Sequence, residues 1–206
     1  MNVEFRGQTP SDVKVTDSAG SDLSIYRSAR ISYGAEDKPT AERLKEFIDN
    51  LLAKGHWVPF EHCVVMYKLK APIFVFRQLF RYRTASISER SLRYTKAKPE
   101  VYIPDELNND YVWEKGNKYR DAIGLVYDCY CDMCKSGVRK EIARAILPFA
   151  TFSEAYFTMD LRNLLHLFEQ RIDKHAQKET RYIAERMAEE AAKLFPITME
   201  CWMEKR

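Results

Sequence analysis

The residues best suited to chemistry are concentrated between positions 77 and 94, R-Q-L-F-R-Y-R-T-A-S-I-S-E-R-S-L-R-Y. Five arginines and one glutamate give this stretch a formal charge of +4, whereas the whole 206-residue chain carries +3. A guanidinium binds phosphate or carboxylate through two parallel hydrogen bonds, and nearby serine hydroxyls add donors. The stretch therefore predicts a site for a phosphorylated small molecule. A nucleic-acid backbone or a solvated basic loop would also account for the charge.

The elements around this stretch should hold its arginines in place. Pro72 occupies a favoured first-turn position, so we expect a helix from there to about Arg83. Arg77, Gln78 and Arg81 then share one face of that helix. After position 83, threonine and serine hydroxyls compete with helical hydrogen bonds, which predicts a loop rather than more helix.

A separate arginine lies late in the chain. Apolar residues recur at helical spacing over 161–168, and Arg171 follows Leu164 by seven positions, on the same stripe unless the helix has already ended. An arginine directed inward needs an anionic or carbonyl partner. A buried ion pair with a glutamate and a contact with a ligand both meet that need.

Residues 81–94 resemble the signature of the flavin-dependent thymidylate synthases, which begins R-H-R, continues through a serine-rich loop with N-E, and ends S-x-R-Y. The spacing matches throughout. Tyr82 stands where the family usually has histidine, and Ser88 where it often has asparagine. Both departures lie where the family holds flavin and nucleotide, so they bear on cofactor affinity.

Two further blocks carry the same resemblance. Residues 55–62, G-H-W-V-P-F-E-H, are similar to G-H-x-x-P-F-E-H, and residues 160–177, D-L-R-N-L-L-H-L-F-E-Q-R-I-D-K-H-A-Q, are similar to N-x-R-S-L-x-N-F-x-x-x-R-x-D-x-x-A-Q. Val58 replaces a residue that is often threonine. Asp160 and His166 replace residues that are usually asparagine.

The resemblance implies reductive methylation of dUMP to dTMP, with 5,10-methylenetetrahydrofolate as one-carbon donor and FAD, reduced by NADPH, as hydride carrier. It also implies an α/β (α+β) fold with a small, largely antiparallel sheet flanked by helices, in a homotetramer whose sites are shared between chains. Charged site residues such as Arg83, Asp160 and Arg162, which would otherwise lack partners in one chain, favour the tetramer. A non-enzymatic nucleotide- or RNA-binding module is the competing class, and a flavoprotein that has lost thymidylate synthesis is a second enzyme alternative.

By positional match the resemblance also implies ligand contacts. The residues that would bind dUMP are Gln78, Arg81, Glu89, Arg90, Ser91, Arg93, Arg144 and Arg171. The residues that would bind FAD are Ser32, Val58, Arg81, Tyr82, Arg83, Glu89, Asp160, Arg162 and His166, with His56 near flavin and folate. Arg171 would be catalytic, stabilising negative charge on the uracil ring. Attack by Ser91 is disfavoured, because only arginines and Glu89 surround it and none of them is a suitable base.

Two groups of residues resemble metal sites on paper, and we expect no metal at either. His56 and His62 flank Pro59, which should keep the segment off a regular helix and leaves no third fixed ligand. Cys129 and Cys131 would point to opposite sides of a helix predicted over 110–135, so these cysteines, with Cys134, are expected to pack.

Length and composition predict one domain, because 46% hydrophobic residues can form a sizeable core. The resemblance implies that residues 1–206 form a single flavin-dependent thymidylate synthase domain. An odd number of irregularly spaced cysteines, five in all, fits a reducing cytoplasm. No apolar run suggests a signal peptide or a membrane span, and we expect neither a membrane nor a nucleic-acid partner. Strands are predicted near 64–70 and 149–159. Helices are predicted over 22–31, 40–52, 138–146 and from about 173 to 194, with Asp173 as the last helix's cap and Pro196 beyond its end.

Overall fold

The structure, a computed structural model, describes residues 2–7, 11–34, 37–108 and 113–205; of 108 and 113–116 it describes only the backbone. The chain divides into two compact units. The first comprises Met1–Asp12, Lys70–Leu79 and Ser88–Ala155, and the second comprises Val13–Leu69, Phe80–Ile87 and Tyr156–Arg206. Over the described ranges, no helix combines the length and the apolar character needed to cross a bilayer.

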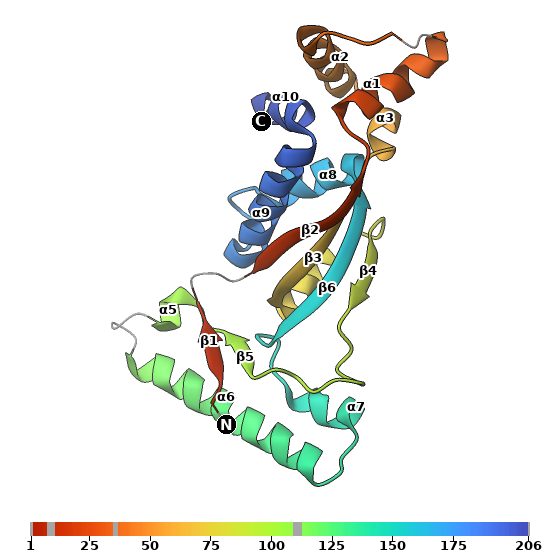
Figure 1. Ribbon diagram of the computed structural model, residues 1–206. Coiled ribbons are helices and arrows are strands. Elements are labelled where there is room, and N and C mark those ends of the chain that lie inside the picture. The colour runs from red at the N-terminus through yellow and green to blue at the C-terminus, as the bar shows by residue number, and fades with distance from the viewer. Residues whose placement is uncertain (1, 8–10, 35–36, 109–112, 206) are drawn as a thin grey trace. The chain divides into compact units, whose positions relative to one another are not determined.

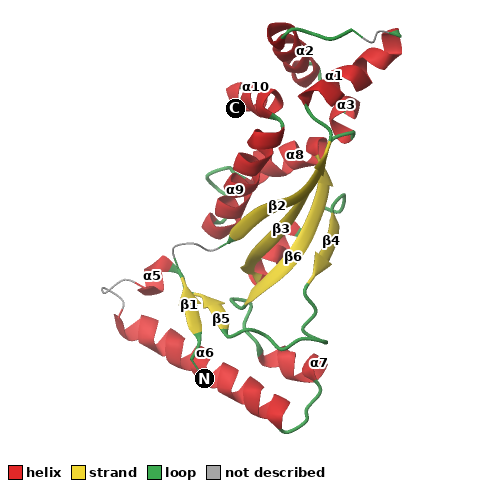
Figure 2. Ribbon diagram, viewed as in Figure 1, coloured by secondary structure: helices red, strands yellow, loops and turns green. Residues whose placement is uncertain are grey.

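The larger sheet is antiparallel, with the strand order β2 (Asp12–Ala19), β3 (Val64–Pro72), β6 (Phe152–Asp160) and β4 (Ser86–Glu89) (Figure 1). Strand β3 alternates as its sequence predicts: Val65, Tyr67 and Leu69 are fully buried, whereas Lys68 between them is exposed. Helices accompany this small sheet (Figure 2), so the expected mixed α/β class is confirmed.

The helices of the second unit precede and follow its strands. They are α1 (Asp22–Arg30), α2 (Ala41–Ala53), α3 (Val58–Glu61), α8 (Leu161–Arg171), α9 (Lys178–Leu194) and α10 (Pro196–Glu204), with a 3-10 turn η1 (Ile31–Tyr33). Thr40 starts α2 as predicted, because its hydroxyl accepts a hydrogen bond from the Arg43 amide at 3.3 Å. The buried hydroxyl of Tyr67 donates to the Met187 carbonyl at 3.1 Å, which ties β3 to α9.

The first unit contains a second, two-stranded sheet in which β1 (Glu4–Arg6) runs parallel to β5 (Glu100–Tyr102). Its helices are α4 (Ile73–Leu79), α5 (Asp105–Asn108), α6 (Trp113–Lys135) and α7 (Lys140–Ala143), followed by a 3-10 turn η3 (Arg144–Ile146). The helix predicted over 110–135 is confirmed from Trp113 onward, and its residues Ile123, Tyr127 and Tyr130 are buried. Positions 110–112 of that prediction lie outside the described residues. Tyr127 also donates to the Thr151 hydroxyl at 3.1 Å.

Three predictions around the arginine stretch and the histidines need correction. The helix that begins near Pro72 ends at Leu79, not at 83. The segment after position 83 is not only a loop, because residues 86–89 form β4 beside β6, so sheet pairing satisfies backbone groups that we assigned to hydroxyls. Pro59 does not prevent a helix either. It lies in the first turn of α3, where its missing N–H leaves no helical hydrogen bond unmade.

The C-terminal prediction is also wrong in part. Helix α9 begins at Lys178 with Gln177 as its cap, whereas Asp173 accepts a hydrogen bond from the His175 amide at 2.8 Å. Pro196 does lie beyond the end of α9 at Leu194, as predicted, but α9 is not the last helix, since Pro196 opens α10. A proline in a first turn and a proline after a helix end look alike in sequence, and only the packing of α10 distinguishes them.

Helix α10 is fixed to α1 by one buried carboxylate. The Asp22 side chain, 6% exposed, accepts hydrogen bonds from the Ile197 and Thr198 amides at 3.0 Å each and from the Thr198 hydroxyl at 2.6 Å. The carboxylate thereby satisfies orphan amides in the first turn of α10 and favours the positive end of its dipole.

We therefore expect Asp22→Ala to lower the free energy of unfolding by about 3 kcal/mol, because the half-buried Ile197 amide and the buried Thr198 amide and hydroxyl lose a charged acceptor. Asp49→Ala is the matched control. Its ion pair with Lys205 at 2.7 Å also joins a helix to α10 but lies near the surface, so about 0.5 kcal/mol is expected. Urea unfolding followed by circular dichroism measures both. Equal losses would show that Asp22 does not hold α10.

Candidate active site

Tyr82 of the arginine stretch contacts the end of α8 within the second unit. Its hydroxyl donates to Gln170 Oε1 at 2.9 Å, and Gln170 Nε2 lies 3.1 Å from His166 Nε2. The Tyr82 and His166 rings meet edge to face, with centroids 6.3 Å apart. The guanidinium carbon of Arg171 lies 5.4 Å from the centre of the Tyr82 ring, within cation–π range. The structure thus brings together three predicted site residues: Tyr82, His166 and Arg171.

Arg171 is the last residue of α8 and is half-buried. Its Nε atom is buried and, among the described residues, has no hydrogen-bond partner. The guanidinium lies against the Tyr82 side chain, and among the described residues no glutamate forms an ion pair with it. Because buried N–H groups are nearly always paired, this N–H is suited to an acceptor atom of a ligand.

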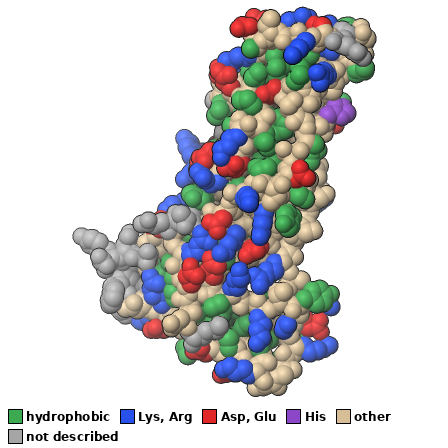
Figure 3. Space-filling view, in the orientation of Figure 1, with side chains coloured by type: hydrophobic (Ala, Val, Ile, Leu, Met, Phe, Trp, Pro, Cys, Tyr) green, Lys and Arg blue, Asp and Glu red, His purple; other side chains and the backbone are tan. Residues whose placement is uncertain are grey.

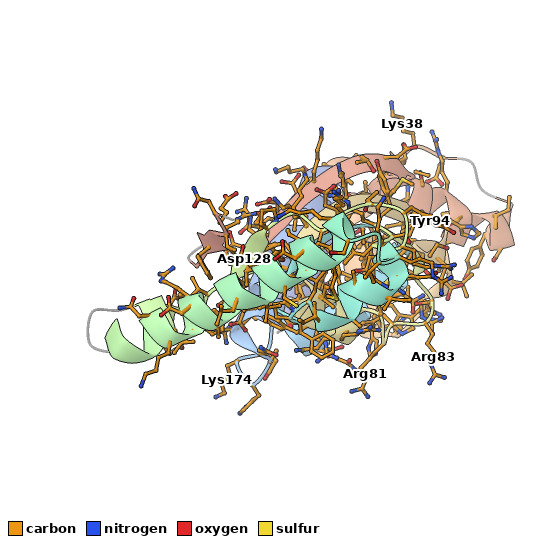
Figure 4. The ribbon with its side chains drawn as sticks, turned by 90° about the horizontal axis from the view of Figure 1, so that it is seen from below. Lys38, Arg81, Arg83, Tyr94, Asp128 and Lys174 are labelled. Carbon is orange, nitrogen blue, oxygen red and sulfur yellow. The ribbon has the colours of Figure 1, made fainter. Side chains whose placement is uncertain are left out.

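The Tyr82 phenol is held in its neutral form. Burial raises its pKa above the ordinary value, and the charge and hydrogen bonding of Arg171, together with the charge of Arg81, oppose that rise. The hydroxyl therefore remains a donor to Gln170 at neutral pH. Arg81 and Arg83, on either side, are exposed and point away from the ribbon (Figure 4), so these predicted ligand-binding arginines face solvent within this unit.

Predicted flavin-binding residues line two cavities of the second unit. The first, of about 290 Å³, is lined by Trp57, Arg162, Asn163, Leu165, His166, Glu169 and Trp202. Arg162 forms an ion pair with Glu61, which orients its guanidinium. Two indole rings beside an arginine and a histidine offer apolar walls with polar edges, a composition suited to a flat heteroaromatic ligand.

The second cavity, of about 510 Å³, is lined by the predicted flavin and folate residues from the first third of the chain. Ser32, His56 and Val58 all line it, and Val58 is 63% exposed. Trp57 lines both cavities, although it was not among the predicted site residues. The signal for Trp57 was present but weak, since it occupies an unspecified position in the G-H-x-x-P-F-E-H block.

In the first unit, Arg93 lines a basic cavity of about 480 Å³ together with Tyr94, Lys96, Cys134, Gly137, Val138, Arg139, Lys140 and Glu141. Four cations and one glutamate give this lining a formal charge of +3. Glu141 forms ion pairs on both sides, with its carboxylate oxygens 3.4 Å from Arg93 Nε and 3.0 Å from Arg139 Nη1. The glutamate holds two guanidinium groups in place and leaves an excess of positive charge for an anion.

Other predicted substrate residues lie in the same unit. Arg90 donates through Nε to the Thr95 hydroxyl at 3.2 Å, and the Ser91 hydroxyl accepts from the Arg93 amide at 3.3 Å. This contact is with a backbone amide, which is not a base, and the expectation that Ser91 is not a nucleophile stays a prediction. Three further members of the set are Gln78, half-buried on α4, Glu89, exposed at the end of β4, and Arg144, exposed at the start of η3.

Asp160 has a local role that the sequence did not suggest. Its carboxylate caps α8, with Oδ1 accepting from the Asn163 amide at 3.0 Å and Oδ2 from the Asn163 side-chain amide at 2.6 Å. Both oxygens are engaged, so the unusual carboxylate near a predicted flavin site is explained by helix capping.

No group of three or more histidine, cysteine, aspartate or glutamate side chains in the described part of the chain is arranged to hold a metal ion. Cys131 and Cys134 of α6 pack against Tyr130 and Ala143, as expected for packing cysteines. Cys129 is exposed, so that expectation was wrong for this residue.

Comparisons with known proteins agree on one family. The family model described as "Thymidylate synthase complementing protein" matches residues 14–197. The flavin-dependent thymidylate synthase of Thermosipho africanus is 35% identical over 216 residues, covering 98% of this chain and 94% of that protein. The enzyme of the same name from Kosmotoga olearia is 35% identical over 206 residues, covering 93% and 89%.

Solved structures of a UMP/dUMP methylase are also similar to this chain. The UMP/dUMP methylase PolB from Streptomyces cacaoi, crystallised with 5-Br dUMP, superposes with a TM-score of 0.91 at 29% identity, covering 98% of this chain and 97% of that one. Its structure with 5-Br UMP gives a TM-score of 0.87 at 28% identity, covering 98% and 96%.

The capping role of Asp160 is testable by a pair of substitutions. Asp160→Ala removes the acceptor for the Asn163 amide and should lower the free energy of unfolding by about 1 kcal/mol. Asp160→Asn retains a capping oxygen and should cost less than about 0.5 kcal/mol. Thermal unfolding by calorimetry compares them. If the asparagine variant were as unstable as the alanine variant, the carboxylate charge rather than the cap would be what matters.

Proposed function

The chain belongs to the family of flavin-dependent thymidylate synthases, and we propose that it converts dUMP to dTMP with FAD, 5,10-methylenetetrahydrofolate and NADPH. It is an enzyme of that type, which leaves the non-enzymatic nucleotide- or RNA-binding module as an alternative that is not favoured. On the face in Figure 3, lysine and arginine side chains lie next to aspartate and glutamate, which does not resemble a continuous basic surface for nucleic acid.

The observation that best supports the proposed reaction is the environment of the Arg171 guanidinium. Its guanidinium lies over Tyr82, and its buried Nε–H has no partner among the described residues. A fixed cation with an available donor stabilises charge that develops in the transition state more than charge in the ground state. We assign Arg171 to the uracil of dUMP, where it stabilises the negative charge that makes carbon 5 nucleophilic.

The donor set of the second unit fits FAD. The two indoles, Arg162 and His166 of one cavity, and Ser32, His56 and Val58 of the other, provide apolar walls and polar contacts for a flavin, and Tyr82, with the exposed Arg81 and Arg83, lies in the same unit. Bound FAD supplies hydride transfer. Asp160 would act only indirectly, by starting the helix that carries Arg162, His166 and Arg171.

The basic cavity of the first unit fits a phosphate. Arg93, held by Glu141, and the cations Lys96, Arg139 and Lys140 would neutralise the phosphate of dUMP. We propose that Gln78, Arg81, Glu89, Arg90, Ser91 and Arg144 complete the substrate contacts.

We further propose that residues 1–206 act as a single domain in a cytoplasmic homotetramer whose sites are shared between chains. Unpartnered charged residues now support the tetramer less, because Arg162 pairs with Glu61 and Asp160 with Asn163 inside one chain. The solvent-facing Arg81 and Arg83 still suit a ligand shared with another chain. Light scattering should give about four times the 24.2 kDa of one chain. A monomer that turns over dUMP would contradict the shared site.

The assignment of the chemistry to Arg171 is tested with two variants. Arg171→Ala should still bind FAD but lose about a few hundredfold in turnover, because one well-placed donor contributes about 3 kcal/mol to transition-state stabilisation. Ser91→Ala should keep measurable dTMP formation with weaker dUMP binding. NADPH-dependent release of the hydrogen on carbon 5 of dUMP measures both. A dead Ser91→Ala that still binds dUMP, with Arg171→Ala near normal, would reverse the assignment.

A further inference from the structure

We propose that Tyr82 is the positioning residue for Arg171, with Gln170 and His166 fixing the phenol in turn. The inference rests on the proposed role of Arg171 at the substrate. It differs from the role that the family resemblance implies for position 82, because the contacts of Tyr82 are with α8.

The ring of Tyr82 limits where the guanidinium can lie. The Arg171 side chain ends α8 without a carboxylate partner among the described residues, and the Tyr82 side chain, whose ring centre lies 5.4 Å from the guanidinium carbon, is the contact that orients it. A ring attracts the cation through its face and accepts few of its N–H groups. The guanidinium is therefore held while a donor remains available to a ligand.

The hydroxyl of Tyr82 fixes the ring itself. Because Tyr82 donates to Gln170 Oε1, the amide nitrogen of Gln170 faces His166. An amide nitrogen can only donate, so His166 Nε2 is the acceptor in this contact. Gln170 and His166 lie four residues apart on one face of α8, so the chain of hydrogen bonds anchors the phenol to the same helix that ends in Arg171.

Contact with the Arg171 guanidinium through the ring and a hydrogen bond to Gln170 through the hydroxyl together require tyrosine at position 82. A phenol carries its hydroxyl at the far end of the ring, where it reaches Gln170 while the ring face stays under the cation. Histidine, the usual family residue, has its polar atoms within a smaller ring. Phenylalanine retains the ring face without the anchor, and leucine retains neither, so this pair separates the two contributions.

The experiment uses full-length, FAD-loaded protein and measures kcat and KM for release of the hydrogen on carbon 5 of dUMP. Tyr82→Leu should lower kcat about 30-fold and change KM less than about threefold, since a misplaced guanidinium affects charge development more than binding. Tyr82→Phe should lower kcat about threefold. Tyr182→Leu, which removes a half-buried tyrosine of α9, is the control and should leave kcat unchanged.

A double-mutant cycle decides whether Tyr82 acts through Arg171. In the Arg171→Ala background, Tyr82→Leu should have no further effect on kcat. An equal additional loss, or an effect of Tyr82→Leu confined to FAD affinity, would overturn the proposal. Calorimetric titration of dUMP without NADPH repeats the cycle independently of turnover, with about a threefold weakening expected only when Arg171 is present. If wild-type protein releases no hydrogen, the proposed function fails, and the calorimetric cycle still decides the positioning role.

Discussion

The structure of the candidate site depends on one cation held over one ring. Arg171 ends its helix with a buried Nε–H that has no acceptor among the described residues, and Tyr82 supplies a face that orients the guanidinium without consuming that donor. An ion pair would have fixed the arginine more strongly but would have neutralised the charge that the proposed chemistry requires. Helix capping by Asp160 and burial of the α8 stripe serve this arrangement, because they determine where the helix begins and how it lies.

Two other arginines of the candidate sites are held by carboxylates. Arg93 is held by Glu141, and Arg162 by Glu61, so each guanidinium is oriented by one carboxylate. Around Arg93, the remaining cations leave the cavity positive. Within the short stretch of sequence that concentrates the charge, Arg93 is thus held by an acidic partner, whereas Arg81 and Arg83 face solvent.

The sequence predicted the kind of reaction better than it predicted which side chains contact one another. The resemblance predicts Arg171 and Tyr82 as site residues, and these roles stay predictions. Amphipathic periodicity located α2, β3, α6 and α8, because such patterns are local. Spacing could not show that Tyr82 contacts a helix 88 positions later, nor that Asp160 is a cap, since both depend on tertiary packing. Strand β1 and helix α10 were missed for the same reason. One is three residues long and pairs with a distant strand, and the other is opened by Pro196 and anchored by Asp22.

The most direct test of the central claim is the nitrogen-15 resonance of the Arg171 Nε–H, assigned by its loss in Arg171→Lys. A buried donor above an aromatic ring should give a slowly exchanging, upfield-shifted proton signal in the FAD-loaded protein, and this signal should move downfield when dUMP supplies an acceptor. A signal that exchanges as fast as that of an exposed arginine and does not respond to dUMP would contradict the account, because Arg171 would then be neither held by Tyr82 nor directed at the substrate.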